Sequence, residues 1–516
     1  MAVAEPEPPS IEHSIEGDLA SGEIMGGRYR LGSLLGRGGM GEVYRAFDVA
    51  MARPVALKRF RLAADREADK LRFRREFHTL AQFSHPRIVD AYDFGLDESG
   101  QPFYTMELLD GRDLGKLAPM EWKRACPLLR DVASALAFLH SRQLLHRDIA
   151  PRNVRCTSDG RAKLIDFGMM ATVGVSNEIV GTLPSIAPEM ILGLPMDGRA
   201  DLFGLGALAF WLLTGRHPQR VRSLDDLMRN GRRPPPPPSR LVADIPPELD
   251  DLVLSLLSPE PLGRPNGASA LIDRLTAIAD LAQAPELDVA QGYVHSARLV
   301  GRSREIELLR KRIERTVAGS GSSVIIEGRS GMGKTRLMRE IELEAKLAGA
   351  LVLRGEGEIT GPYALIRTLA RELELGVRGG VIGNSGPHGA LIDRLLPVLG
   401  APRGRGMPTL SSTDTQRVDH REERLALQTA LSDFMSTFAV HRPLVILIDN
   451  VHRVDEGSAA VLASLAHLAH DRSLLVIGSI RTDEPIRASG ALSHQKLLDS
   501  GYCCLLGTTG NRLGGI

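Results

Sequence analysis

The chain has 516 residues, of which 43% are hydrophobic and 25% are charged, and these globular values exclude a chain that is disordered or fibrous throughout. The 64 Lys and Arg residues nearly balance the 63 Asp and Glu residues, so the net charge of +1 indicates no bulk attraction to nucleic acid or to an anionic membrane. At about 150 residues per domain, the length predicts roughly three domains.

Lysine is scarce in this chain, with 9 Lys beside 55 Arg. Arg can replace Lys on a solvated surface, but not where a compact ammonium group must reach one phosphate, so the retained lysines are candidate phosphate ligands. The 4 cysteines are too few for a disulfide framework and predict a reducing compartment. The longest apolar run, 202–213, is shorter than the roughly 18 residues of a membrane span, and we therefore expect a cytoplasmic protein without a membrane partner.

The first part of the chain has the pattern of a small β-rich lobe followed by a larger α-rich lobe. Residues 1–28 are acidic and lack the apolar core of a signal peptide, so they predict a disordered tail. Alternating runs then predict strands at 29–35, 42–47, 54–59 and 103–108, with a helix near 65–83, and the pattern from 128 to about 280 is mostly helical. Five prolines at 234–238 predict a stiff surface loop, with a docking site for a proline-reading partner as the alternative.

A second pattern follows the linker that we expect at 280–297. Helix and strand alternate at 302–316, 323–327, 335–347 and 350–354, and again at 444–448, 458–470 and 473–480. This alternation predicts an α/β domain with a parallel sheet over 298–485. Residues 486–516 remain an uncertain tail, because from about 501 the pattern ends in a way that a truncation or a shifted reading frame would produce.

A glycine-rich run at 36–43 reads GRGGMGEV and places glycines at Gly36, Gly38 and Gly41. A dinucleotide-binding turn has the same spacing, but it leads into a helix, whereas this run leads into the strand-like residues 43–47. The next strand presents Lys58, one of the scarce lysines. A glycine-rich hairpin followed by a strand that bears Lys is the arrangement that covers ATP in protein kinases.

Residues 29–279 therefore resemble the catalytic domain of a bacterial Hanks-type serine/threonine protein kinase, because the later motifs of that family follow in order. They are HRDIAPRN at 146–153, DFG at 166–168 and APE at 187–189. The resemblance implies an α+β bilobal fold and transfer of the ATP γ-phosphate to protein hydroxyls with Mg²⁺ as cofactor. The ATP-binding residues that it implies are Leu35, Gly36, Gly38, Gly41, Val43, Ala56, Lys58, Glu76, Met106 and Leu108.

The same resemblance assigns roles within the motifs. Asp148 orients the substrate hydroxyl and accepts its proton, Lys58 binds the phosphates in a pair with Glu76, and Asn153 and Asp166 bind magnesium. It also implies that Asp201 is the family's helix-anchoring Asp and that Arg264 pairs with Glu189.

Some positions depart from the family pattern. Ser/Thr kinases usually carry Lys two residues after the catalytic Asp, where this chain has Ala150, so we include Arg152, four residues after Asp148, among the catalytic residues. Arg155 replaces the apolar floor of the adenine pocket, and Ser185 replaces an aromatic residue after the retained Thr182. We expect Ser/Thr rather than Tyr specificity.

Activation by phosphorylation is a further expectation. Arg147, directly before the catalytic Asp, is expected to be an unpaired cation that a phosphate on the activation segment would order. Thr172 and Ser176 are the candidate acceptors, and we hypothesise autophosphorylation of one of them.

A second phosphate motif, GRSGMGKT, occupies 328–335, between an apolar strand and a helix. It is a complete P-loop with Gly328, Gly331, Gly333, Lys334 and Thr335, in which Lys334 reaches the β- and γ-phosphates and Thr335 ligates magnesium. Residues 298–485 resemble STAND-type AAA+ ATPases, which implies that Asp449 completes the magnesium site and that ATP binds at this second site too. The acidic residue that usually follows is Asn450 here, and since an amide cannot accept a proton, we expect slow hydrolysis and a nucleotide switch.

The motifs together predict a kinase that phosphorylates Ser/Thr-containing protein substrates and itself, and that a C-terminal ATP-binding switch regulates. The alternative is a pseudokinase scaffold whose signalling is confined to the P-loop domain, which Ala150 and Arg155 motivate. A transcriptional regulator driven by the ATPase has no support, because the sequence contains no helix-turn-helix or basic patch. Oligomerisation stays open.

Overall fold

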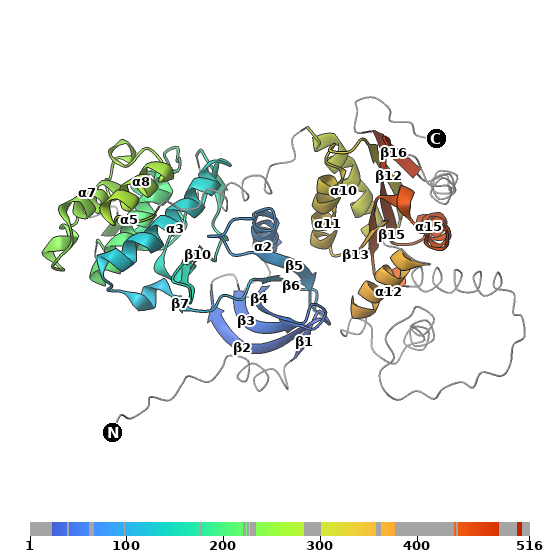
Figure 1. Ribbon diagram of the computed structural model, residues 1–516, viewed down its shortest axis with the longest axis horizontal. Coiled ribbons are helices and arrows are strands. Elements are labelled where there is room, and N and C mark those ends of the chain that lie inside the picture. Colours follow the sequence, from blue (N-terminus) through green and yellow to red (C-terminus); the bar gives the residue numbers. More distant parts are fainter. Residues whose placement is uncertain are drawn as a thin grey trace, which may run out of the picture.

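A computed structural model of the chain describes residues 23–38, 41–60, 67–97, 99–175, 178–219, 223, 226–227, 234–282, 301–357, 363–376, 438–439, 442–484 and 503–507. Figure 1 shows an antiparallel sheet with helix α2 beside it, a helical region that follows, and a separate parallel sheet flanked by helices. No helix within the described part is long and apolar enough to cross a membrane.

The first lobe is a six-stranded antiparallel sheet with the order β1-β2-β3-β4-β6-β5. Its strands are β1 (Ile24–Met25), β2 (Tyr29–Arg37), β3 (Gly41–Asp48), β4 (Arg53–Phe60), β5 (Ala91–Leu96) and β6 (Pro102–Met106). Helix α2 (Glu67–Leu80) covers one face, where the ring of Phe73 lies 5.6 Å from that of Phe60 and 5.2 Å from that of Tyr104. This aromatic packing fixes α2, and with it Glu76, against the sheet.

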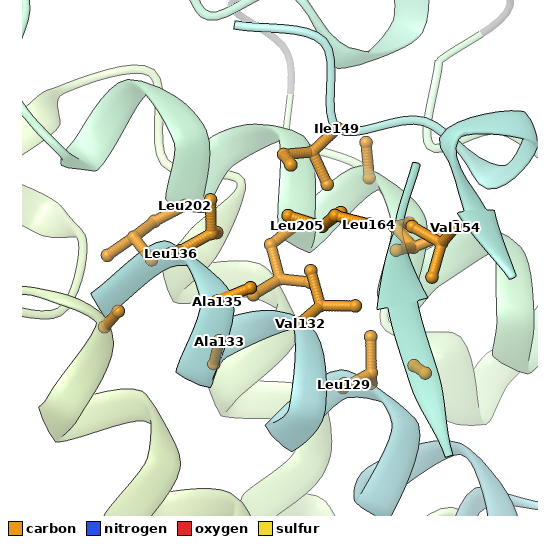
Figure 2. Close-up of a cluster of buried hydrophobic side chains, with 14 of the residues drawn as sticks. Leu129, Val132, Ala133, Ala135, Leu136, Ile149, Val154, Leu164, Leu202 and Leu205 are labelled. Atoms are coloured by element: carbon orange, nitrogen blue, oxygen red, sulfur yellow. The ribbon is translucent and has the colours of Figure 1, made fainter. Parts of the chain in front are cut away.

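The second lobe is helical. Its main helices are α3 (Trp122–His140), α5 (Arg199–Thr214), α7 (Pro247–Leu256) and α8 (Ala268–Ile278). Helix α5 is apolar on all sides and almost wholly buried, as expected for a helix at the centre of a lobe. Figure 2 shows its Leu202 and Leu205 among Leu129, Val132 and Leu136 of α3, with Ile149 of the HRD loop above them.

Short elements shape the surface between the lobes. They are β7 (Arg112–Asp113), β8 (Leu144–Leu145), β9 (Val154–Cys156), β10 (Ala162–Leu164), β11 (Ala171–Thr172) and α4 (Pro188–Ile191). Strands β9 and β10 pair around a hairpin, and the Val154 and Leu164 side chains on them enter the core shown in Figure 2. The HRD motif lies between β8 and β9, so the catalytic loop is attached to the core at both ends.

The C-terminal domain contains a five-stranded parallel sheet with the order β13-β14-β15-β12-β16. Its strands are β12 (Ser322–Gly328), β13 (Leu351–Glu356), β14 (Leu444–Asp449), β15 (Leu474–Arg481) and β16 (Cys503–Gly507). Successive residues of β12 point to opposite faces, since Val324 packs with helices α10 (Ser303–Val317) and α11 (Lys334–Leu347), whereas Ile325 packs with α12 (Ala364–Gly376) and α15 (Glu456–Leu468). Helices on both faces and buried parallel strands make this a three-layer α/β domain.

The fold agrees with the predicted class in both regions: an antiparallel lobe and a helical lobe are followed by a parallel α/β sheet. Eight of the described strands were not predicted: the short β1, β7, β8, β9, β10 and β11, and the longer β5 and β16. Strand β5 (AYDFGL) has a mixed pattern, and β16 lies in the segment that the sequence analysis left as an uncertain tail. Strand β16 pairs in parallel with β12 over residues 323–327, and such edge pairing depends on tertiary contacts that a local pattern does not reveal.

Candidate active site and second nucleotide site

A cleft of about 630 Å³ lies between the kinase-like lobes. It brings together most of the residues that the sequence analysis singled out: Leu35, Gly36, Gly38, Gly41, Val43, Ala56, Lys58, Met106, Leu108, Asp148, Arg152, Asn153 and Asp166. Val89, Asp113, Ile165 and Met169 also line it and were not predicted. Ile165 directly precedes the DFG motif, so position alone could have suggested it.

The ammonium group of Lys58 makes two ion pairs at the back of this cleft. Its Nζ lies 2.7 Å from Glu76 Oε1 and 3.3 Å from Asp166 Oδ1, and Tyr104 donates a hydrogen bond of 2.8 Å to the same Glu76 oxygen. Burial would lower the pKa of Lys58, but these carboxylates raise it well above the ordinary value, so the group stays charged. Helix α2 and strand β4 thus hold a permanent cation at the position where phosphates are expected.

The glycine-rich hairpin connects β2 and β3 above the cleft. Gly41 begins β3, and a Cβ atom on it would lie 2.3 Å from the carbonyl oxygen of Arg59 on β4. Only glycine therefore fits at this point, where β3 and β4 pair closely. A Cβ on Gly36, in contrast, would meet nothing within 4 Å. Gly36 lines the cleft, and packing does not require glycine there.

The carboxylate of Asp148 is held by hydrogen bonds to both oxygens. Oδ1 accepts bonds from the Thr182 amide (2.9 Å) and hydroxyl (2.7 Å), and Oδ2 accepts from Asn153 Nδ2 (2.8 Å) and Arg152 Nη2 (3.2 Å). The chain begins this loop with Arg147 at a φ of +65°, and the amides of His146 and Arg147 donate to Asp201 at 2.9 and 2.8 Å. A buried aspartate thus fixes the loop, and the loop fixes Asp148 in the cleft.

Two oxygen-bearing side chains in this cleft fit a divalent cation. Asn153 uses its amide nitrogen to bond Asp148, which leaves Oδ1 as its remaining acceptor, and Asp166 presents a half-exposed carboxylate. Burial would raise the pKa of Asp166, but Lys58 and the Gly168 amide lower it, so the carboxylate is ionised at neutral pH. Carboxylate and amide oxygens are the ligands that Mg²⁺ prefers.

The departures from the kinase pattern have clear positions. Ala150 is buried, and its side chain cannot supply the missing cation. Arg152 is exposed but lies within 3.2 Å of Asp148, so a guanidinium stands at the cleft entrance. Arg155, on β9, lines the cleft together with apolar Val43 and Leu108, as expected for a residue at the adenine floor.

The activation segment differs from one expectation. Arg147 is not an unpaired cation: its Nε donates to the Met169 carbonyl (2.6 Å), and its Nη2 lies 3.9 Å from Glu178. Glu178 was not predicted to pair with Arg147, because it belongs to no sequence motif. Thr172 is exposed on β11, and Ser176 lies outside the described residues.

The P-loop forms a second cavity of about 350 Å³. Lys334 and Thr335 begin α11, and Gly333 precedes them with a φ of +80°, a conformation that favours glycine. Thr335 Oγ1 donates a hydrogen bond of 2.6 Å to Asp449 Oδ2, so the start of α11 and the end of β14 bring together the two residues expected at the magnesium site. Lys334 Nζ donates to the carbonyls of Gly328 (2.7 Å) and Arg329 (2.9 Å).

Residues at and after the end of β15 border this cavity, and Arg481 and Asp483 among them were not predicted as site residues. Arg481, which ends β15, and Asn450, which follows Asp449, both line it. The Asp483 carboxylate accepts bonds from the Ser330 amide of the P-loop at 3.1 and 3.2 Å, as an anion would. His452 is buried against Glu484, and burial lowers the pKa of its imidazole, in keeping with a structural role.

These two sites define a protein that carries a kinase-type cleft and, after it, a P-loop nucleotide site. Comparison with known families gives the same division: residues 29–275 match the protein kinase domain, and residues 298–477 match the AAA ATPase domain. The chain therefore contains a protein kinase domain followed by an AAA ATPase domain.

Several curated relatives are similar to about half of the chain. The chain is 35% identical over 297 residues to the serine/threonine-protein kinase PksC of Streptomyces coelicolor, covering 54% of this chain and 53% of that protein. It is 36% identical over 278 residues to the serine/threonine-protein kinase PknB of Mycolicibacterium smegmatis (50% and 44%). It is 35% identical over 268 residues to the DNA damage-responsive serine/threonine-protein kinase RqkA of Deinococcus radiodurans (49% and 40%). The chain thus spans about half the length of these relatives or less.

Proposed function

We propose that this chain is a serine/threonine protein kinase that transfers the γ-phosphate of ATP to protein hydroxyls, its own included. The observation that carries the proposal is the catalytic carboxylate of Asp148, which four hydrogen bonds hold in a cleft that also contains Lys58 and Asp166. Phosphoryl transfer needs positioned cations and one proton acceptor, and this set supplies them.

Each residue of the set has a defined task. Lys58 binds the α- and β-phosphates and is oriented by Glu76 at 2.7 Å. Asp166 and Asn153 would hold Mg²⁺, which neutralises charge on the transferring phosphate when bound. Asp148 accepts the proton of the substrate hydroxyl, and Arg152, 3.2 Å from it, adds positive charge where Ala150 does not.

We further propose that the ATPase domain binds ATP with Mg²⁺ through Lys334, Thr335 and Asp449 and acts as a switch on the kinase. Asn450 lines that cavity where an acidic residue would polarise water, which supports slow hydrolysis. The 4 cysteines support a cytoplasmic location.

One assay tests both parts: transfer of label from γ-labelled ATP to the chain itself and to a generic basic protein. Lys58→Met should abolish transfer, Lys334→Ala should change its rate, and Lys311→Met, an exposed lysine on α10, should behave as wild type. Unchanged transfer with Lys58→Met would contradict the kinase assignment. The pseudokinase alternative predicts no transfer by the wild type and unaltered signalling by Asp148→Asn.

A further inference from the structure

Helix α11 of the ATPase domain contacts the first lobe of the kinase domain. It begins at Lys334 of the P-loop and ends at Leu347, and it touches both α2 and β5. Figure 1 shows α2 and β5 facing this helix. The same helix thus begins at the ATPase nucleotide site and, further along, contacts both β5 and the helix α2 that carries Glu76.

An ion pair joins α11 to β5. Lys346 Nζ lies 2.8 Å from Asp93 Oδ1 and 3.0 Å from Glu342 Oε1, and Arg28 Nη1 lies 2.8 Å from the other Asp93 oxygen. Burial would lower the pKa of Lys346, but the two carboxylates raise it above its usual value. The contact is therefore a largely buried cluster of two cations and two carboxylates, and loss of Lys346 would leave Asp93 with Arg28 as its remaining ion-pair partner among the described residues.

A second polar cluster joins α11 to the C-terminal end of α2. His78 Nε2 lies 3.3 Å from Glu340 and 3.8 Å from Glu344, and Gln82 donates a bond of 3.2 Å to Glu340. The three groups are close enough for a metal ion, but both oxygens of Glu344 already accept bonds from Arg310 at 2.7 and 3.2 Å. We assign the cluster to domain docking.

Apolar contacts accompany these charges. Leu343 and Leu347 of α11 pack against the hydrophobic core of the kinase domain, to which Phe77 of α2 belongs. Phe77 is adjacent to Glu76, and its ring lies 5.5 Å from that of Tyr104, which bonds Glu76. Because a helix moves as a rigid element, restraint at Phe77 and His78 restrains Glu76 as well.

Arg336 and Arg339 of α11 connect the two sites electrostatically. Both line the P-loop cavity, and both also line a cleft of about 400 Å³ between α11 and the kinase lobe. Arg336 also lowers the pKa of Glu340, after the larger effect of His78. The negative charge of a nucleotide bound in the P-loop cavity therefore changes the electrostatic potential at Glu340, in the cleft between α11 and the kinase lobe.

We propose that docking of α11 on α2 and β5 holds Glu76 beside Lys58, and that nucleotide at the P-loop acts on the kinase through this contact. The proposal rests on the proposed switch function and identifies α11 as the element that links the P-loop to Glu76. It assigns Lys346, Glu340 and Leu343 as positioning residues of the kinase. None of the three is among the described residues that line the kinase cleft or the P-loop cavity.

The test uses the full chain and a double-mutant cycle on initial rates of phosphate transfer. Lys346→Met keeps the aliphatic stem, and Lys346→Glu reverses the charge; both should lower the rate, the second by at least about fivefold. Lys311→Met and Lys311→Glu on exposed α10 are the matched controls and should keep the wild-type rate. Hydrogen exchange of residues 67–80 should be faster in both Lys346 variants, a change that a defect confined to the ATPase domain would not produce.

The cycle separates this proposal from the switch itself. Lys334→Ala should change the rate in the wild type but have no further effect in the Lys346→Glu chain. If Lys334→Ala has no effect in the wild type, the switch function fails. If it has the same effect in both backgrounds, or if the Lys346 variants transfer phosphate and exchange at wild-type rates, the α11 route is overturned while the switch stands.

Discussion

The Glu178 carboxylate of the activation segment lies 3.1 Å from the Arg72 guanidinium of α2. The same carboxylate lies 3.9 Å from Arg147 of the HRD motif. A carboxylate thus stands between two arginines, in the position where the sequence analysis had expected a phosphate. The contact joins the activation segment to the helix that carries Glu76.

Glu178→Ala should lower the rate of phosphate transfer by about two- to fivefold. The two side chains are partly exposed, and exposed ion pairs contribute at most about 1 kcal/mol, which bounds the effect. Thr172→Ala is the control and should retain the wild-type rate, since a carboxylate already contacts both arginines. A wild-type rate for Glu178→Ala together with a large loss for Thr172→Ala would restore phosphorylation of Thr172 as the ordering device.

The chain should bind two ATP molecules in the presence of Mg²⁺, and Lys334→Ala should bind one. The reason is that, among the described residues, the kinase cleft and the P-loop cavity have no lining residue in common. Titration calorimetry gives the stoichiometry, with Lys311→Ala as the control that keeps two sites. A wild-type stoichiometry of one would mean that one of the two cavities does not accept nucleotide.

The buried pair of Arg264 and Glu189 should be a large contributor to kinase-domain stability. The two groups meet in a bidentate contact of 2.6 and 2.9 Å. Glu189→Ala should lower the free energy of unfolding by about 3 to 5 kcal/mol, because it leaves a buried guanidinium without its carboxylate. Urea unfolding followed by tryptophan fluorescence measures this, since both tryptophans, Trp122 and Trp211, lie in the helical lobe.

The double variant Glu189→Ala, Arg264→Met is the check on this interpretation. Its free energy of unfolding should lie between those of Glu189→Ala and the wild type, because no buried charge remains unpaired. Equal stability of the wild type and Glu189→Ala would mean that the pair contributes nothing.

The stability of the kinase domain should fall as the pH decreases from about 7 to 5, and His85 should account for part of the fall. Burial, helped by Arg87 and Arg142, lowers the pKa of His85 from 6.5 to about 4. The unfolded chain therefore binds a proton that the folded domain excludes, and about 2 kcal/mol is lost by pH 5. His85→Gln should show a smaller difference between unfolding at pH 7.5 and pH 5. An unchanged pH dependence of stability in this variant would show that His85 does not cause the loss of stability at low pH.

Much of the site could be predicted because its residues fall in motifs with fixed order and spacing. Lys58, Asp148 and Asp166 are far apart in the chain, yet the kinase resemblance placed them together, and the cleft contains all three. Lys334, Thr335 and Asp449 follow in the same way from the P-loop and the strand that ends in a carboxylate.

Contacts that depend on tertiary structure could not be predicted. Glu178 and Asp483 are ordinary surface acids in the sequence, and only the fold brings them to Arg72 and to the P-loop amide of Ser330. Strand β16 forms by pairing with β12, a contact between segments far apart in the sequence. The scarcity of lysine pointed to Lys58 and Lys334 but not to Lys346, whose ammonium group makes a specific ion pair with Asp93.

The central claim is that this chain phosphorylates Ser and Thr through Asp148. The most direct measurement is mass-spectrometric identification of the residues phosphorylated when wild type and Asp148→Asn are incubated with ATP, Mg²⁺ and a generic basic protein. We predict phosphoserine and phosphothreonine with the wild type and a loss of at least about 100-fold in rate with Asp148→Asn. Phosphotyrosine alone would contradict the specificity, and equal transfer by both chains would contradict the role of Asp148.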